Sequence, residues 1–138
     1  MLGATAADWR AAVRLAGDAL VTAGSAKPAY ADEMIRMIEE HGPYVVIAPG
    51  LALAHARPGP DVLADGLSIV TLATPVYFGH PHNDPVRVVL GLAVTSSSEH
   101  LAAVAAVANV FNDSTAITDL AEASSAAQVQ AIMGAVEP

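Results

Sequence analysis

Cysteine is absent from this chain of 138 residues, which excludes disulfides, thiolate nucleophiles and cysteine-based zinc sites. Basic residues are scarce as well. Six lysines and arginines stand against 14 aspartates and glutamates, so the net charge is -8. This balance opposes non-specific binding to nucleic acid, which needs basic patches, and it suits a partner with a basic face. An anionic ligand would need a local exception to the acidic field.

Long apolar runs and export signals are missing too. No run reaches the roughly 18 apolar residues that a membrane-spanning helix needs. Residues 1–7 lack the charged start and apolar centre of a signal peptide. Apolar residues nevertheless make up 54% of the chain, enough for a large core. We therefore expect one cytoplasmic domain, residues 1–138, with no membrane insertion.

The apolar pattern has helical spacing at both ends of the chain. Asp8 is expected to cap a first helix that Gly24 ends, and a second helix begins near Pro28 and stops at Gly42. Helical patterns return over residues 99–111, 115–122 and after residue 125.

Between these helices the pattern is that of strands. Short apolar runs predict strands at residues 44–47, 51–53, 67–73 and 86–94. The last run is the strongest and is expected at the centre of the sheet, whereas Pro75 ends the third strand or places it at an edge. Helices, then strands, then helices predict an α/β fold, a three-layer α/β/α sandwich with a mixed β-sheet.

Five histidines are the main chemical candidates, because no serine elbow, phosphate loop or dinucleotide fingerprint occurs. His55 ends an apolar segment and is followed by Arg57 and a Pro-Gly-Pro loop. Junctions of strands and loops are where folds place functional groups. Neutral imidazole is a good nucleophile near pH 7, because its usual pKa is about 6.5. We interpret His55 as the reactive group of the protein, and a phosphorylated imidazole is a labile group that passes its phosphoryl onward; the alternative is a histidine that only completes a strand end.

The other histidines carry weaker signals. His100 lies in the first turn of an expected helix, where N–H groups favour an anion, but an exposed structural histidine fits the local sequence better. His80 and His82 alternate in a loop with Asp84 nearby, a pattern that binds zinc or copper in some proteins; a solvated turn is the simpler interpretation. His41 ends a helix, where a cation complements the helix dipole, and we interpret it as structural.

Residues 42–58 read GPYVVIAPGLALAHARP, and three further stretches follow in order and spacing: 78–86, 90–101 and 124–129. Together they resemble enzyme IIA proteins of the bacterial phosphoenolpyruvate-dependent sugar phosphotransferase system. The resemblance is to the mannitol/fructose superfamily, and closest to its ascorbate-type branch. It implies a three-layer α/β/α sandwich and a phosphotransferase without metal or organic cofactor.

The resemblance also implies roles for single residues. The histidine at the position of His55 accepts a phosphoryl group from phosphorylated HPr and donates it to a cysteine of enzyme IIB, which serves enzyme IIC and uptake of an ascorbate-like sugar. The histidine at the position of His100 assists in the same site. We expect Arg57, Asn83 and Asp84 to contact the phosphoryl group or a partner.

The chain departs from that family at a few positions. Ala54 stands where many members have proline, whose ring fixes the approach of the backbone. Glu39 and Glu40 stand where mannitol-type members carry an arginine, which argues against mannitol specificity and leaves Arg57 as the basic residue. The usual N-terminal strand is reduced to a few residues.

Two other functions stay open at this point. One is a regulatory phosphohistidine module that controls a partner protein without passing the phosphoryl group onward. The other is a metal-binding protein that uses His80, His82 and Asp84. The oligomeric state also stays open, and a homodimer is one option.

Overall fold

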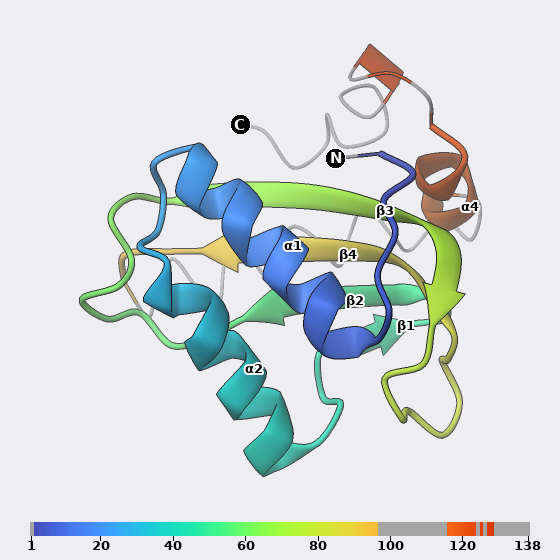
Figure 1. Ribbon diagram of the computed structural model, residues 1–138, viewed down its shortest axis with the longest axis horizontal. Helices are drawn as coiled ribbons and strands as arrows, with labels where there is room; N and C mark the ends of the chain where they lie inside the picture. The colour runs from blue at the N-terminus through green and yellow to red at the C-terminus, as the bar shows by residue number, and fades with distance from the viewer. Residues whose placement is uncertain (1, 97–115, 124, 126, 129–138) are drawn as a thin grey trace.

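The computed structural model describes residues 2–96, 116–123, 125, 127 and 128 (Figure 1). The elements are α1 (Trp9–Thr22), α2 (Ala29–His41), β1 (Val46–Ala48), β2 (Leu51–His55), β3 (Gly66–Val76), β4 (Val86–Ala93) and α4 (Ala116–Ala121). The helix expected over residues 99–111 lies outside the described residues, and so does most of the last one. Within the described part, no helix is both long and apolar enough to cross a membrane.

The four strands form one mixed sheet in the order β1-β2-β4-β3. β4 pairs in parallel with β2 and antiparallel with β3, so the predicted central strand is confirmed. β3 is an edge strand that runs through Pro75, and its register is irregular between Thr71 and Val76. A proline without an N–H group is tolerated at such an edge. The N-terminal segment adds a single bridge, from Ala4 to Leu72 of β3.

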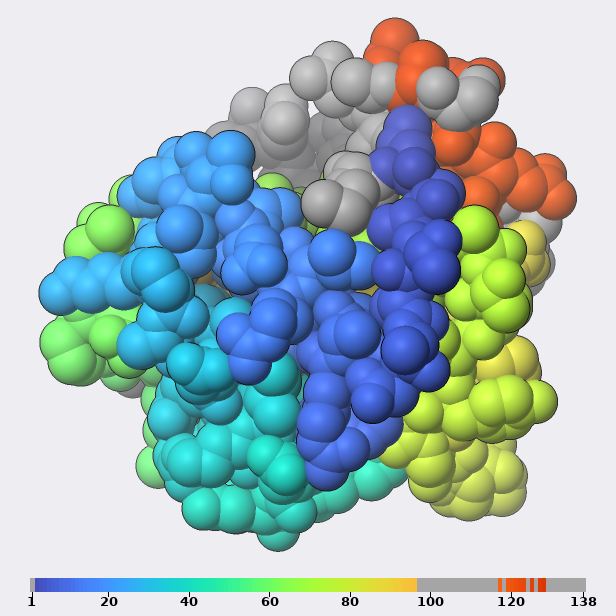
Figure 2. All heavy atoms as spheres, viewed as in Figure 1, coloured from blue at the N-terminus to red at the C-terminus, as the bar shows by residue number. Residues whose placement is uncertain are grey.

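Helices cover both faces of the sheet, which confirms the predicted α/β/α arrangement. On one face α1 and α2 pack over small and β-branched residues of β2 and β4, such as Ala52 and Val89. On the other face α4 places Leu120 against Leu53 and Leu90. Figure 2 shows the atoms of α1 and α2 in continuous contact over the first face.

The first helices form where their caps and apolar spacing predict. The Asp8 carboxylate accepts the N–H of Ala11 at 2.9 Å and caps α1, and Gly42 ends α2 with a φ of 83°. Exposed ion pairs join the outer faces of the two helices, between Arg10 and Glu39 and between Arg14 and Asp32. Pairs so exposed contribute little, so burial of the apolar faces holds the helices together.

Close packing between α1 and α2 depends on Gly17, which faces α2 from the middle of α1. A Cβ added there would lie 2.6 Å from the Cβ and 3.0 Å from the Cα of Ala31. The second contact is with backbone, which cannot rotate away. The small residue therefore sets how closely the two helices approach.

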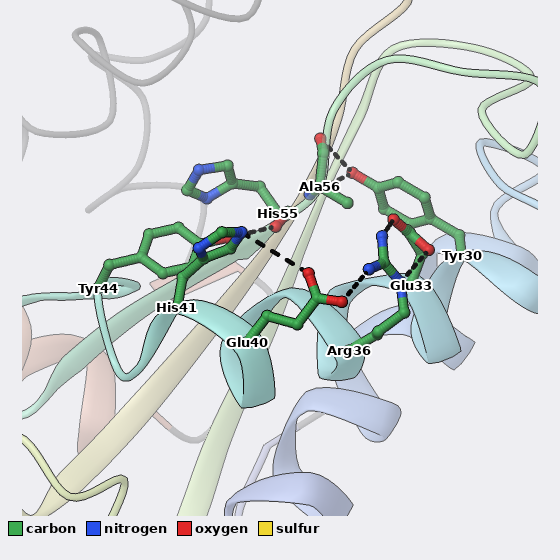
Figure 3. A network of polar contacts seen from close by, with 8 residues as sticks. All are labelled: Tyr30, Glu33, Arg36, Glu40, His41, Tyr44, His55 and Ala56. Carbon is green, nitrogen blue, oxygen red and sulfur yellow. Dashed lines mark hydrogen bonds and ion pairs between the residues drawn. The ribbon is translucent and has the colours of Figure 1, made fainter.

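One buried hydroxyl ties α2 to the ends of β2 and β4 (Figure 3). Tyr30 is 1% exposed, and its hydroxyl donates to the carbonyl of Leu92 at 2.7 Å and accepts the N–H of Ala56 at 3.1 Å. The carbonyl of Ala56 lies 3.3 Å from the same oxygen. Burial raises the pKa of the Tyr30 phenol, so the hydroxyl keeps its proton for the bond to Leu92. This contact fixes the backbone just after His55.

Replacement of Gly17 by alanine is expected to destabilise the fold, although Gly→Ala inside a helix normally stabilises by about 1 kcal/mol. The clash with Ala31 costs about 1–3 kcal/mol and outweighs that gain. Urea unfolding measures the change, and Asp18→Ala on the exposed face of α1 is the matched control, expected to be neutral or stabilising. An increase in stability for Gly17→Ala would contradict this account of the helix contact.

Removal of the Tyr30 hydroxyl is expected to lower the free energy of unfolding by about 1–3 kcal/mol, because Tyr30→Phe leaves buried backbone groups of Ala56 and Leu92 without their partner. Tyr77→Phe removes the hydroxyl of a side chain that is 72% exposed and should change stability by less than about 0.5 kcal/mol. Urea unfolding of the two variants tests the difference. Equal effects would show that the buried hydroxyl does not hold the strand ends.

Candidate functional site

His55 is the last residue of β2 and lies opposite Leu92 in the parallel pairing with β4. Its neighbours Ala54 and Ala56 are 0% and 2% exposed, whereas the His55 side chain is half-buried. The ladder holds the backbone on one side of His55, and the Tyr30 hydroxyl holds it on the other. The imidazole therefore projects from a strand end whose backbone is held on both sides.

The tautomer of His55 follows from one short contact. Its Nδ1 lies 2.8 Å from the carbonyl oxygen of Leu53. A carbonyl oxygen only accepts hydrogen bonds, so Nδ1 carries the proton and donates it. In the neutral ring Nε2 is then the unprotonated nitrogen and holds the lone pair. A positioned nitrogen lone pair is what nucleophilic attack requires.

His55 lines a cavity of about 320 Å³ at the place where α2 ends and β2 ends. The lining residues are Met37, His41, Tyr44, His55, Ala56 and Arg57. These described lining residues include two imidazoles, a guanidinium and a phenol, and none of them is a carboxylate. In a chain with a net charge of -8, this cavity is the local exception that an anionic ligand needs.

Tyr44 forms one wall of this cavity beside His55. The two rings meet edge to face, with centroids 5.6 Å apart and planes at 89°. The Tyr44 hydroxyl lies 3.4 Å from the carbonyl oxygen of His55 and points its proton toward it. Burial raises the pKa of the Tyr44 phenol, while the positive charge of Arg57 acts in the opposite direction. Arg57 is thus close enough to act on the same cavity.

Arg36 in the last turns of α2 does not line the cavity, although it lies near it in sequence. Its guanidinium binds Glu40 at 2.6 Å and makes a very short contact with Glu33, both on the same helix (Figure 3). These two carboxylates raise the pKa of Arg36. Among the described lining residues other than His55, the groups that can carry positive charge are instead His41, when protonated, and Arg57.

The structure brings His55 and Arg57 together, but it places Asn83 elsewhere. The carbonyl of Asn83 accepts the N–H of Gly50 at 2.9 Å. Gly50 precedes β2, whereas His55 ends it, so Asn83 lies at the opposite end of the strand. Contact of Asn83 and the adjacent Asp84 with the same phosphoryl group as His55 does not fit this geometry, and their contact with a partner protein stays a prediction.

Asp84 holds the loop before β4 in shape. Its carboxylate accepts the backbone N–H groups of Phe78, Gly79 and His80 at 3.0, 2.6 and 2.9 Å. The Nδ1 atom of His80 likewise accepts two backbone N–H groups, from residues 82 and 83. These atoms therefore serve the turn. Among the described residues, no group of three or more histidines, aspartates or glutamates is placed to hold a metal ion.

His100, the second expected site histidine, lies outside the described residues. Sequence reasoning also missed two residues that the structure does show. Tyr44 was assigned to a strand, and His41 to a helix end without a functional role. The available signal was the Pro49-Gly50 turn. It makes β1 and β2 an antiparallel hairpin, and so returns the segment before β1 to the end of β2.

Comparison with known proteins finds similar sequences and similar solved structures. The ascorbate-specific EIIA component of Escherichia coli (strain K12) is 39% identical over 113 residues, which cover 81% of this chain and 73% of that protein. A structure of mannitol enzyme IIA in complex with phosphorylated enzyme IIB, also from Escherichia coli, matches with a TM-score of 0.86 at 26% identity, covering 97% of this chain and 92% of that chain. Nitrogen regulatory protein IIA-Ntr from Neisseria meningitidis matches with a TM-score of 0.81 at 25% identity, covering 96% and 90%.

A model of a whole protein family also matches, over nearly the full length of the chain. The family model for the EIIA 2 component of the phosphoenolpyruvate-dependent sugar phosphotransferase system matches residues 1–135. That span includes all four strands of the sheet and every described residue that lines the cavity. The chain therefore belongs to the EIIA 2 family of the phosphoenolpyruvate-dependent sugar phosphotransferase system and has the phosphotransfer role of that family.

Proposed function

We propose that this protein is a cytoplasmic phosphotransferase that accepts a phosphoryl group on Nε2 of His55 from phosphorylated HPr. It then passes the group to a cysteine of an enzyme IIB, which serves an enzyme IIC in uptake of an ascorbate-like sugar. The observation that carries the proposal is the 2.8 Å contact from Nδ1 of His55 to the Leu53 carbonyl, because it directs the lone pair to Nε2. The 39% identity to an ascorbate-specific component supports the sugar class.

The transfer needs two displacements at phosphorus. In the first, Nε2 of His55 forms a bond to phosphorus as the phosphorus–nitrogen bond of the donor breaks. The ring keeps the proton on Nδ1, and the Leu53 carbonyl stabilises the positive charge that the ring gains. That charge makes the ring a good leaving group in the second step, when a cysteine thiolate of enzyme IIB forms its bond to phosphorus and Nε2 recovers its lone pair.

Cations beside His55 stabilise the negative charge that spreads over the phosphoryl oxygens in each step. Arg57 lines the cavity and supplies a permanent one. His100 is proposed as a second ligand of the phosphoryl group on the family resemblance alone. The neighbour bound to phosphorylated enzyme IIB supports enzyme IIB as the acceptor. Phosphorylated HPr and enzyme IIB would use the same face in turn, so each interface is modest in area.

Incubation with phosphorylated HPr tests the first step. The wild type is expected to gain close to one acid-labile phosphoryl group per chain, and nuclear magnetic resonance of the ring should place it on Nε2. His55→Ala is expected to gain none, whereas His82→Ala, in the loop at the far end of β2, should gain as much as the wild type. Equal labelling of His55→Ala and wild type would refute the assignment.

The likeness to nitrogen regulatory protein IIA-Ntr favours a second candidate, a phosphohistidine module that controls a partner protein. The two functions differ in the step after phosphorylation. With an ascorbate-type enzyme IIB added, the carrier is expected to lose its phosphoryl group to the IIB cysteine within the mixing time of the assay. A phosphorylated protein that keeps its label in the presence of active enzyme IIB would favour the regulatory function.

A further inference from the structure

His41 shares the cavity with His55, although the transfer described above does not use it. It is the last residue of α2, and its exposed imidazole lines the cavity wall. Its ring meets Tyr44 at 6.5 Å and 76°, and Tyr44 in turn meets His55. Figure 3 shows the three rings gathered at the end of β2.

His41 lies near two sources of negative charge. The C-terminal end of α2 carries partial negative charge, which favours a cation. Glu40 lies 3.8 Å from Nε2 of His41, near the limit for an ion pair. That carboxylate is already bound by Arg36 at 2.6 Å. His41 therefore has a weak partner and lies beside a cavity built for negative charge.

The charged and titratable groups around His41 come from several elements. On α2 they are Glu40, Arg36 and Glu39, the last paired with Arg10 of α1; Tyr44 precedes β1, and His55 and Arg57 stand at the end of β2. The carboxylates of this set are paired with arginines, and none lines the cavity. A phosphoryl group brings up to two negative charges into the cavity. Of the described lining residues, only His41 and Arg57 can meet it as cations apart from His55 itself.

We propose that His41 is a phosphoryl-binding residue of this site, which takes up a proton when His55 is phosphorylated and binds the phosphoryl oxygens opposite Arg57. The proposal rests on the function proposed above. Its consequence is a pH dependence with a definite sign. Because the phosphorylated protein binds the proton more tightly, a fall in pH through the titration of His41 shifts the equilibrium with the phosphodonor toward the phosphorylated protein.

A pair of variants tests the proton uptake without any phosphodonor. His55→Glu places a negative charge in the cavity, and His55→Gln places a neutral side chain of the same shape there. The titration midpoint of His41, followed by nuclear magnetic resonance, is expected to be higher in His55→Glu by about 0.5 pH unit or more. His82, at the far end of β2, is the internal control and should titrate at the same pH in both. Equal midpoints for His41 in the two variants would overturn the proposal.

A second pair tests the bound phosphoryl group in chains that keep His55. His41→Gln is expected to lower the phosphorylated fraction at equilibrium with phosphorylated HPr by about threefold to tenfold at pH 6.5, a loss typical of one charged contact. His41→Lys should restore the fraction and flatten its pH dependence, because its charge is permanent in this range. Unchanged fractions in both variants would also overturn the proposal. If the wild type itself gains no phosphoryl group, the proposed function fails, while the comparison of His55→Glu with His55→Gln still decides whether His41 takes up a proton when the cavity gains a negative charge.

Discussion

Strands β2 and β4 run parallel over five residue pairs, from Leu51 opposite Val88 to His55 opposite Leu92. This pairing decides where chemistry can occur, because the carboxyl ends of two neighbouring parallel strands meet at one edge of the sheet. In open α/β folds, that edge is where ligands bind. Here it holds His55, the Tyr30 hydroxyl that ties Ala56 to Leu92, and the cavity. The loop before β4 is carried to the other edge, where Asp84 and His80 stabilise its turn.

The net charge of the chain does not describe the charge beside His55, because the position of the charged side chains matters more than their sum. A chain with a net charge of -8 repels anions at long range, yet none of the described residues that line the cavity beside His55 is a carboxylate. The glutamates near it are bound to arginines of the helix surface: Glu33 and Glu40 to Arg36, and Glu39 to Arg10. Such exposed pairs add little to stability. At this edge they bind the carboxylates of the helix surface, and none of these three glutamates lines the cavity, while the acidic remainder of the surface suits a partner with a basic face.

Local patterns were enough to predict the described helices and strands to within a few residues and to single out His55 as a candidate, but not to predict which residues surround it. Helix caps at Asp8 and Gly42, and a histidine at the end of an apolar run, are features of a few consecutive residues. The position of residues 83 and 84 depends on strand order, which no short stretch encodes, and their expected contact with the phosphoryl group did not fit. The sequence predicts a structural role for His41, because a cation at the end of a helix complements the helix dipole and needs no further explanation. The hairpin of β1 and β2 returns Tyr44 to His55, and this contact brings His41 to the cavity as well.

Ala54 shows how tertiary contacts replace a local constraint. A proline before the reactive histidine fixes one backbone angle at the cost of an N–H group. Here residue 54 lies in β2, between β1 and β4, is fully buried, and stands opposite Gly91 in the parallel ladder. Gly91 itself has no room for a Cβ, which would lie 2.3 Å from the hydroxyl of Ser68. With the ladder on one side of His55 and the Tyr30 hydroxyl on the other, the strand end is held at both flanks, so alanine at this position does not loosen the presentation of the imidazole.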